Sequence, residues 1–368
     1  MIIMVKFEVE LTALLEQTRE AYGLPGCDCS VWQNGQEIYR KIVGVEDLKT
    51  GTPLTENTLY NIYSNTKVVT CVAAMQLYEQ GLFRLEDPIS RYFPEMEQLQ
   101  VKTEEGGSRP AEHPITILDL FRMTAGIGDG GYGDMGMQFY METAGECPII
   151  RLPEFLARVP LFYEPGTEYR YGIGHEVLAA LIEKLSGQSF SDYLEEHIFE
   201  PVGMKNTAFS LEKLSCGALA NQYRYVSGQE IPEEIGPAFC LIPPILKASA
   251  SGGLISTVDD YMKFQMALVE GELLLKRETI DLMRQNHLTE EQLKYYGSAS
   301  QGFGYGLGVR AVLAHDGPGA FGWGGASGSY GVIDPENRLC IFYMQHVFDT
   351  DDATTHRRIT EIIYDGLS

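Results

Sequence analysis

The chain has 368 residues, of which 44% are hydrophobic, and this length is sufficient for two closely packed lobes with substantial cores. Its 51 acidic residues outnumber its 28 lysines and arginines, which gives a formal net charge of -23 at pH 7. Such a chain repels nucleic acid and anionic membrane surfaces, so we expect neither as a partner and interpret the acidity as a contribution to solubility.

The N-terminal region predicts a helix followed by a β-hairpin. Apolar residues at helical spacing come first, and an alternating pattern follows from Cys27 to Val31. The dipeptide Asn34-Gly35 predicts a type I′ turn into a second strand over residues 37–44. Residues 1–5 form too short an apolar run for a signal peptide, and no run approaches the length of a membrane span. We therefore expect a cytoplasmic protein.

The tetrapeptide Ser64-Asn65-Thr66-Lys67 lies between a short β-like run, residues 59–63, and a long helical pattern that reaches Gly81. Because positions i and i+3 share a face of a helix, we expect the Lys67 amine beside the Ser64 hydroxyl. A serine becomes a useful nucleophile when a neighbouring base takes its proton, and a partly buried lysine can do so. The free N–H groups of a first helical turn also suit an oxyanion.

A second Ser-x-x-Lys match occurs at Ser210-Leu211-Glu212-Lys213, but its context differs. It follows a polar, turn-rich stretch that is typical of a surface cap. The segment after Ser64 is apolar on nearly all faces and predicts a buried central helix. Ser64 could serve only as the N-cap of that helix, yet this alternative gives no reason for a lysine in the first turn, where dipole and desolvation disfavour a cation. We therefore expect the nucleophile at Ser64.

Signals for metals, cofactors and disulfides are weak or misplaced. The seven cysteines are scattered and predict reduced thiols, and the seven histidines form no ligand pattern. A Gly-x-Gly-x-x-Gly match at residues 126–131 lies inside a glycine-rich loop, not between a strand and a helix. No Gly-x-Ser-x-Gly elbow occurs, which disfavours the α/β-hydrolase fold. We expect a protein without metal or cofactor.

The remaining elements predict an α+β fold with one antiparallel sheet. Helices are expected near residues 64–81, 115–123, 151–159, 174–187, 189–199, 258–270, 276–286 and 353–366. Strands are expected over residues 305–312, 321–333 and 339–345. The N- and C-terminal helices should cover the sheet. Residues 1–63 and 251–368 would form the sheet lobe and residues 64–250 a mainly helical lobe, packed as one unit with the catalytic cleft between them.

The order of these motifs resembles the serine β-lactamase and penicillin-binding-protein superfamily, and within it the class C-like branch that includes esterases. Besides the Ser-x-x-Lys motif, further stretches resemble this branch, namely Leu85-Glu86-Asp87-Pro88, Tyr92-Phe93-Pro94, residues 115–120 and 123–126, Pro201-Val202-Gly203-Met204, and residues 252–257. The resemblance spans nearly the whole chain and implies the β-lactamase/transpeptidase-like fold.

The second motif of that family is a tyrosine on a loop of the helical lobe, followed two residues later by asparagine in the lactamases. Residues 165–175 match it, with Tyr171 at the motif position and Ile173 in place of the asparagine. A phenol beside a cation loses its proton more readily, so the resemblance implies that Tyr171 is the general base and acid. Without the family match, Tyr171 would be interpreted as an aromatic packed beside Tyr169. Ile173 lacks the amide that bonds a β-lactam side chain, which disfavours efficient lactam turnover.

The third family motif is Lys-Thr-Gly on the strand that lines the cleft, and here the matching residues are Trp323-Gly324-Gly325, as in esterase-like members. Glycines let a substrate approach the backbone, and the resemblance implies that the N–H groups of Ser64 and Ala326 bind the oxyanion. Without the lysine, the carboxylate of a penicillin or a D-Ala-D-Ala peptide loses its partner, so a neutral acyl substrate fits better. The alternative is that these glycines only mark a bend in a strand.

Together these residues predict a serine hydrolase that forms a covalent acyl-enzyme on a small-molecule ester or amide. Carboxylic-ester hydrolysis is the leading reaction, with D-amino-acid peptide or amide cleavage and weak β-lactamase activity as alternatives. A protein that binds penicillin-like or peptidoglycan-like ligands without turnover is the non-enzymatic alternative. Residues 126–147 are expected to form a long loop at the rim of the cleft. The acyl group and the oligomeric state are not indicated by the sequence.

Overall fold

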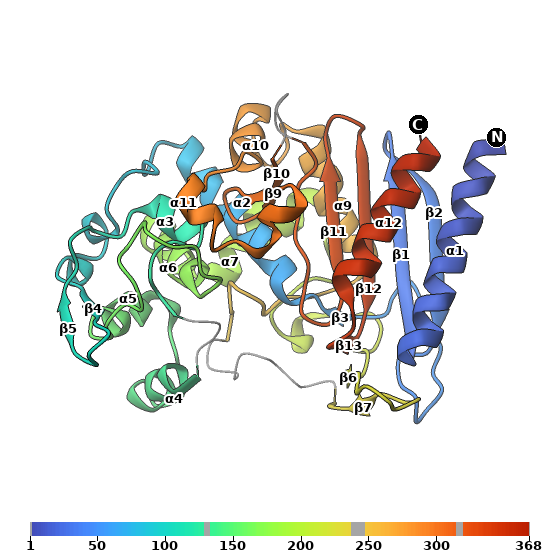
Figure 1. The fold of residues 1–368 in the computed structure, drawn as a ribbon, viewed down its shortest axis with the longest axis horizontal. Helices are drawn as coiled ribbons and strands as arrows, with labels where there is room; N and C mark the ends of the chain where they lie inside the picture. Colours follow the sequence, from blue (N-terminus) through green and yellow to red (C-terminus); the bar gives the residue numbers. More distant parts are fainter. Residues whose placement is uncertain (1, 129–132, 237–246, 314–318, 368) are drawn as a thin grey trace.

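The structure is a computed structural model that describes residues 2–128, 133–236, 247–313 and 319–367 (Figure 1). A four-stranded antiparallel sheet lies at one end of the molecule, and mainly helical elements fill the other end. The strands of this sheet, in spatial order, are β11 (Tyr330–Asp334), β12 (Leu339–Gln345), β1 (Gly26–Gln33) and β2 (Gln36–Gly44). The expected sheet built from both ends of the chain is therefore confirmed.

The hairpin between β1 and β2 forms at the predicted turn. Asn34 and Gly35 both have positive φ angles, 53° and 75°, as a type I′ turn requires. Asparagine tolerates this region better than other side chains, and glycine adopts it without steric cost. The turn therefore fixes the register of the two strands.

Helices cover both faces of the sheet. The terminal helices α1 (Ile2–Tyr22) and α12 (Asp352–Leu367) lie side by side on one face (Figure 1), and α9 (Val258–Glu270) packs on the other. Along β12, Ile341 and Tyr343 face the terminal helices, whereas Phe342 and Met344 join the core that contains α9. Because both faces are covered, all seven residues of β12 are buried, which explains its continuous apolar sequence.

The helical region is built around α2, which has eleven buried residues among its fourteen. This observation confirms the predicted buried central helix. The other helices of the region are α3 (Ile117–Phe121), α4 (Gly133–Glu142), α5 (Leu152–Leu156), α6 (Gly174–Ser186), α7 (Phe190–Leu194) and α8 (Glu200–Val202), and α2 itself spans Thr66–Glu79. One apolar core joins α2 and α6 to α9 and to one face of β12. The division of the chain into two lobes stays a prediction.

Short elements complete the described part of the chain. Two short helices, α10 (Arg277–Met283) and α11 (Glu290–Leu293), follow α9. The short strands form four small sheets, which pair β3 (Tyr60–Asn61) with β8 (Ile255–Ser256), β4 (Gln100–Lys102) with β5 (Ser108–Pro110), β9 (Phe303–Tyr305) with β10 (Arg310–Val312), and β6 (Tyr223–Arg224) with β7 (Glu233–Glu234) and β13 (Val347–Phe348). None of the helices in the described ranges is long and apolar enough to span a bilayer.

Three expected elements differ from the structure. The single strand expected over residues 305–312 is the hairpin of β9 and β10, because the chain turns at Gly308, whose φ is 79°. Of the strand expected over residues 321–333, only the end belongs to β11. The long loop expected over residues 126–147 contains α4, and residues 129–132 of it lie outside the described ranges.

Candidate active site

Ser64 lies in a single 3-10 turn, Tyr63–Asn65, that redirects the chain from β3 into α2. Tyr63 has a φ of 45°, a region that bulky side chains avoid, so the surrounding structure must stabilise this sharp turn. Lys67 Nζ donates a hydrogen bond to Ser64 Oγ at 3.2 Å. The N-cap of α2 is Asn65, so the alternative in which Ser64 only caps this helix is wrong.

The second Ser-x-x-Lys match is a surface feature. Ser210 is exposed, and its Oγ accepts the N–H of Glu212 at the start of a short 3-10 turn. The Lys213 amine forms an ion pair with Glu195 at 2.8 Å and makes no bond to Ser210. The predicted contrast between the two matches is confirmed in their geometry.

Lys67 is almost completely buried, with 3% of its surface exposed. Its Nζ donates to the backbone carbonyl of Ser251 at 2.6 Å and lies 4.7 Å from the centre of the Tyr171 ring. A buried ammonium group requires such partners, because leaving it without them would cost about 3 to 5 kcal/mol. The structure therefore brings Ser64, Lys67 and Tyr171 together, and adds Ser251, which the sequence did not indicate.

Tyr171 is held by Trp323. The indole Nε1 donates a hydrogen bond of 3.0 Å to the phenol oxygen, and the two rings stack with centroids 5.6 Å apart. Trp323 also meets the ring of Tyr305 edge-on at 5.0 Å, and Tyr305 in turn meets Tyr169. Burial raises the pKa of Tyr169 and of Tyr305 well above the usual value, so both phenols are neutral at ordinary pH. The wall of the site beside Tyr171 is thus aromatic, with two unionised phenols behind Trp323.

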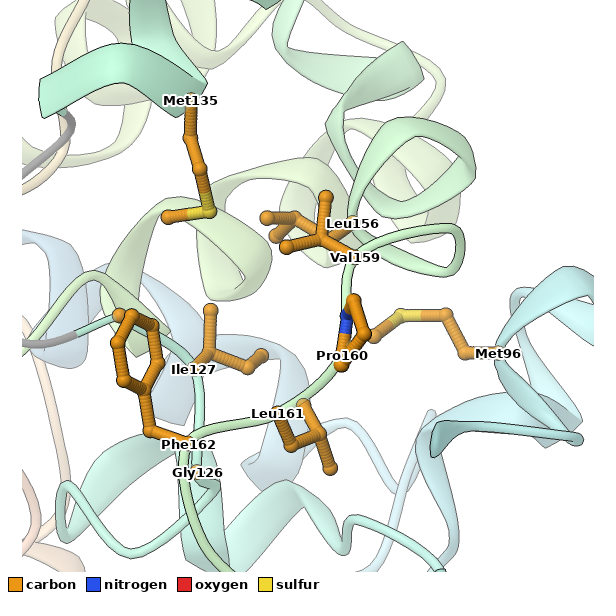
Figure 2. Close-up of a pocket in the computed structure, with 10 residues that line it drawn as sticks. Met96, Gly126, Ile127, Met135, Leu156, Val159, Pro160, Leu161 and Phe162 are labelled. Atoms are coloured by element: carbon orange, nitrogen blue, oxygen red, sulfur yellow. The ribbon is translucent and has the colours of Figure 1, made fainter. Parts of the chain in front are cut away.

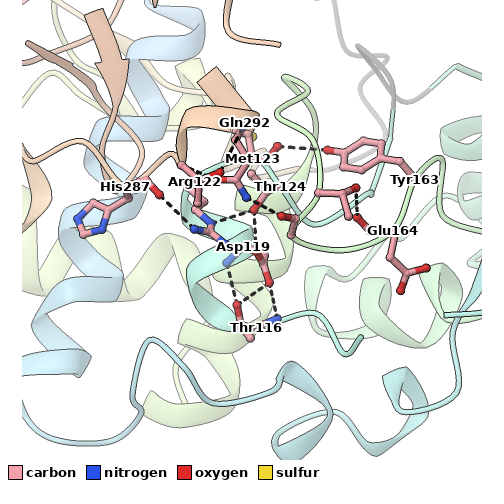
Figure 3. Close-up of polar contacts among 12 residues, drawn as sticks. Thr116, Asp119, Arg122, Met123, Thr124, Tyr163, Glu164, His287 and Gln292 are labelled. Atoms are coloured by element: carbon pink, nitrogen blue, oxygen red, sulfur yellow. Dashed lines mark hydrogen bonds and ion pairs between the residues drawn. The ribbon is translucent and has the colours of Figure 1, made fainter. Parts of the chain in front are cut away.

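The loop that presents Tyr171 is anchored at a strained residue, Met123, whose φ is 60°. The Met123 carbonyl accepts the backbone N–H of Arg170 at 3.0 Å and the hydroxyl of Tyr163 at 3.2 Å, so it holds both ends of the loop. Figure 3 shows the network below this residue, in which Arg122 donates to Asp119 at 2.9 Å and to the carbonyl of His287 at 3.1 Å. This network holds the turn at Met123, to which the loop that carries Tyr171 is hydrogen-bonded.

The stretch Trp323-Gly324-Gly325 leads into a tight turn that touches the Ser64 turn. Gly325 N–H donates to Ser329 O at 2.8 Å, and Ser329 Oγ accepts a bond of 2.7 Å from the Asn65 amide. A Cβ on Gly325 would lie 2.5 Å from the Ile62 carbonyl oxygen, so only glycine permits this approach. The alternative in which these glycines only bend a strand does not account for this contact.

The expected oxyanion donors lie on these two touching turns. Within the part of the chain that the structure describes, neither the Ser64 N–H nor the Ala326 N–H is bonded to an acceptor. Backbone donors without a partner are suited to bind a developing negative charge.

Ile173 differs from the other predicted site residues because it packs into the main apolar core. Its side chain faces the backbone of Gly128, where an added Cβ would lie 3.3 Å from Ile173 Cγ1. Gly128 also lines a small pocket, which Figure 2 shows. Its lining is apolar and contains none of the predicted site residues, and consists of Met96, Gly126, Ile127, Gly128, Met135, Leu156, Val159, Pro160, Leu161 and Phe162.

Metal and thiol chemistry find no support in the described ranges. No group of three or more histidine, cysteine, aspartate or glutamate side chains is placed to hold a metal ion there. The six cysteines in these ranges are free thiols, and Cys240 lies outside them. Burial raises the pKa of Cys71 above its usual range, so this thiol near Lys67 stays protonated.

Comparisons with known proteins relate nearly the whole chain to one family. A family model described as Beta-lactamase matches residues 11–363. Protein Rv1367c of Mycobacterium tuberculosis is 31% identical over 362 residues, which cover 92% of this chain and 90% of that protein. Esterase EstB of Burkholderia gladioli is 26% identical over 364 residues, covering 91% and 89% of the two chains. Lovastatin esterase of Penicillium rubens is 26% identical over 357 residues, covering 85% and 86%.

Solved structures show the same fold. The structure titled "EstCE1, a hydrolase with promiscuous acyltransferase activity" has a TM-score of 0.79 and 22% identity, and covers 99% of this chain and 100% of that one. Simvastatin synthase (LovD) from Aspergillus terreus also has a TM-score of 0.79, with 23% identity and 97% coverage of both chains. The expected β-lactamase/transpeptidase-like fold is therefore confirmed.

The contact of Gly325 with the Ser64 turn yields a first prediction. In Gly325→Ala the added methyl group would collide with Ser329 Oγ and the Ile62 carbonyl, so the two turns must separate. We expect the rate of Ser64 labelling by a fluorophosphonate probe to fall by about 10- to 100-fold, since small displacements of reacting groups have effects of this size. The matched control is Gly297→Ala, where an added Cβ has no neighbour within 4 Å and labelling should be unchanged. Labelling of Gly325→Ala at the wild-type rate would contradict this account of the turn.

Proposed function

The chain belongs to the Beta-lactamase family, and we propose that within it the protein is a serine carboxylesterase that acts through a covalent acyl-enzyme. The family and the esterases among its relatives support a hydrolase of esters in general. The observation that carries the finer proposal is the pair formed by Ser64 and the buried Lys67, whose side-chain atoms are 3.2 Å apart. This pair supplies a nucleophile and a group that can exchange its proton.

In the proposed mechanism, Ser64 Oγ attacks the carbonyl carbon of the ester while its proton passes to Lys67 or Tyr171. The N–H groups of Ser64 and Ala326 stabilise the oxyanion of the tetrahedral intermediate. Collapse of this intermediate breaks the bond between the acyl carbon and the alcohol oxygen, and the alcohol leaves with a proton from Lys67 or Tyr171. Water then attacks the acyl carbon and gives a proton to Lys67 or Tyr171. The second tetrahedral intermediate breaks its bond to Ser64 Oγ, which regains this proton, and the acid is released.

The surroundings of the pair favour a neutral acyl group. Trp323 occupies the position of the lysine in the Lys-Thr-Gly motif. Its indole N–H donates a hydrogen bond to Tyr171, and the side chain has no charge that could bind a substrate carboxylate. Ile173 is buried and supplies no amide to a β-lactam side chain. Both features favour a small-molecule ester over a penicillin or a D-Ala-D-Ala peptide.

Several expectations stay proposals beside the leading reaction. The enzymatic alternatives are cleavage of D-amino-acid peptides or amides and weak β-lactamase activity, and the non-enzymatic one is a binder of penicillin-like or peptidoglycan-like ligands. Repeated turnover of a nitrophenyl ester would favour the enzyme, whereas a single stoichiometric burst would favour the binder. The cytoplasmic location, and the expectation of no nucleic-acid or membrane partner, also stay predictions.

The assignment of the nucleophile can be tested with the two Ser-x-x-Lys serines. Ser64→Ala should lower kcat for a nitrophenyl ester by about 10⁴-fold or more, as deletions of a catalytic nucleophile do in other hydrolases. The matched control is Ser210→Ala, which removes an exposed hydroxyl and should leave kcat unchanged. Substantial turnover by Ser64→Ala would overturn the assignment.

The role of Tyr171 gives a separate prediction. Tyr171→Phe keeps the ring stacked on Trp323 but removes the hydroxyl that Trp323 bonds, so proton transfer should be impaired with the fold intact. We expect kcat to fall by about 10²- to 10⁴-fold, the range usual for a general acid-base group. Ile173→Ala should be milder, because that side chain packs in the core. A kcat for Tyr171→Phe near the wild-type value would leave Lys67 as the sole base.

Substrate class can be tested by comparing a short-chain nitrophenyl ester with nitrocefin. With Trp323 in place of a lysine, the lactam carboxylate lacks a charge-assisted hydrogen bond. With Ile173 in place of an asparagine, the lactam side chain lacks a hydrogen bond to an amide. The two losses together should cost about two orders of magnitude in kcat/KM. We therefore expect the ester to have a kcat/KM at least about 100-fold higher, and Trp323→Lys to narrow this difference. Equal or faster turnover of nitrocefin would move the protein to the lactamases.

A further inference from the structure

Glu176 is a buried carboxylate beside the candidate site that the proposed mechanism does not use. It lies in the first turn of α6, five residues after Tyr171, and is 0% exposed. Its oxygens accept three bonds from one short turn, from Ser249 Oγ at 2.7 Å and from the N–H groups of Ala250 and Ser251 at 2.8 and 2.9 Å. These bonds and the positive end of the helix dipole compensate the buried negative charge.

The same turn holds Lys67 from its other side. The Ser251 carbonyl accepts Lys67 Nζ at 2.6 Å, and the Ala250 carbonyl accepts Thr70 Oγ1 at 2.8 Å. Lys67 and Thr70 lie about one helical turn apart on α2. The Ser249–Ser251 segment is therefore hydrogen-bonded to the start of α6 on one side and to the start of α2 on the other. The position of the Ser251 carbonyl therefore depends on Glu176, and the position of the Lys67 amine depends on that carbonyl.

We propose that Glu176 is a positioning residue for catalysis, which holds the Ser249–Ser251 turn so that its last carbonyl keeps Lys67 Nζ beside Ser64 Oγ. This inference rests on the proposed function. A carboxylate is suited to this task because it only accepts hydrogen bonds, and all three groups that face it are donors. A glutamine would turn an NH₂ group toward at least one of these donors, and the turn would have to shift.

The test compares Glu176→Gln with Glu183→Gln. Glu183 is a matched control because it lies about two turns further along α6, and its carboxylate also accepts a backbone N–H, that of Phe190 at 2.8 Å. We expect Glu176→Gln to lower kcat for a short-chain nitrophenyl ester by about 10- to 100-fold with KM changed by less than about twofold, because the displaced group acts in the chemical step. Labelling of Ser64 by a fluorophosphonate should slow in parallel, and Glu183→Gln should match the wild type.

Two outcomes would overturn the inference. One is a folded Glu176→Gln variant with the wild-type kcat. The other is a variant in which kcat/KM falls only because KM rises. If Glu176→Gln does not fold, Ser249→Ala decides, since it removes one donor from the same carboxylate and should lower kcat by about threefold or more with KM unchanged. An unchanged kcat in Ser249→Ala would then overturn the inference. Failure of the proposed function is distinguishable, because in that case either the wild type would show no repeated turnover of the ester or Ser64→Ala would keep the wild-type activity.

Discussion

The site depends on one constraint, which is that a lysine in the first turn of a buried helix must be given partners. The partners of Lys67 come from three segments that are far apart in the sequence, the Ser64 turn, the turn that ends at Ser251 and the loop that carries Tyr171. A buried cation without them would be costly, so the fold that buries α2 must also bring these segments together. The same contacts that provide these partners also hold the Lys67 amine beside the Ser64 hydroxyl, as the proposed mechanism requires.

The substitution of Trp323 for the family cation changes the site in two ways. It removes a positive charge from the site. It also adds an indole ring that stacks on the Tyr171 ring and donates a hydrogen bond to the Tyr171 hydroxyl. The glycines that follow let this stretch approach the Ser64 turn closely, because a Cβ on Gly325 would lie 2.5 Å from the Ile62 carbonyl oxygen. The orientation of the Tyr171 phenol and the close approach of the two turns that carry the proposed oxyanion donors thus both depend on this stretch.

Local signals in the sequence predicted the parts of the structure that local forces decide. Asn34-Gly35 fixed the hairpin through its positive φ angles, and the three-residue spacing placed Lys67 beside Ser64. Long-range contacts were not predictable, as with Glu176, whose partners lie more than seventy residues away. A charged residue directly before the apolar run of residues 177–182 in α6 was the available signal for it. The helix α4 was missed because its glycines outweighed Met135 and Phe139, which pack inward at helical spacing.

The most direct test of the central claim is to map the site of fluorophosphonate labelling by mass spectrometry. The Ser64–Lys67 pair predicts one equivalent of probe on the peptide that contains Ser64, because of the two Ser-x-x-Lys serines only Ser64 has a buried lysine amine at 3.2 Å. A label on the peptide that contains Ser210, or on any peptide without Ser64, would contradict the account. So would active protein that takes up no label.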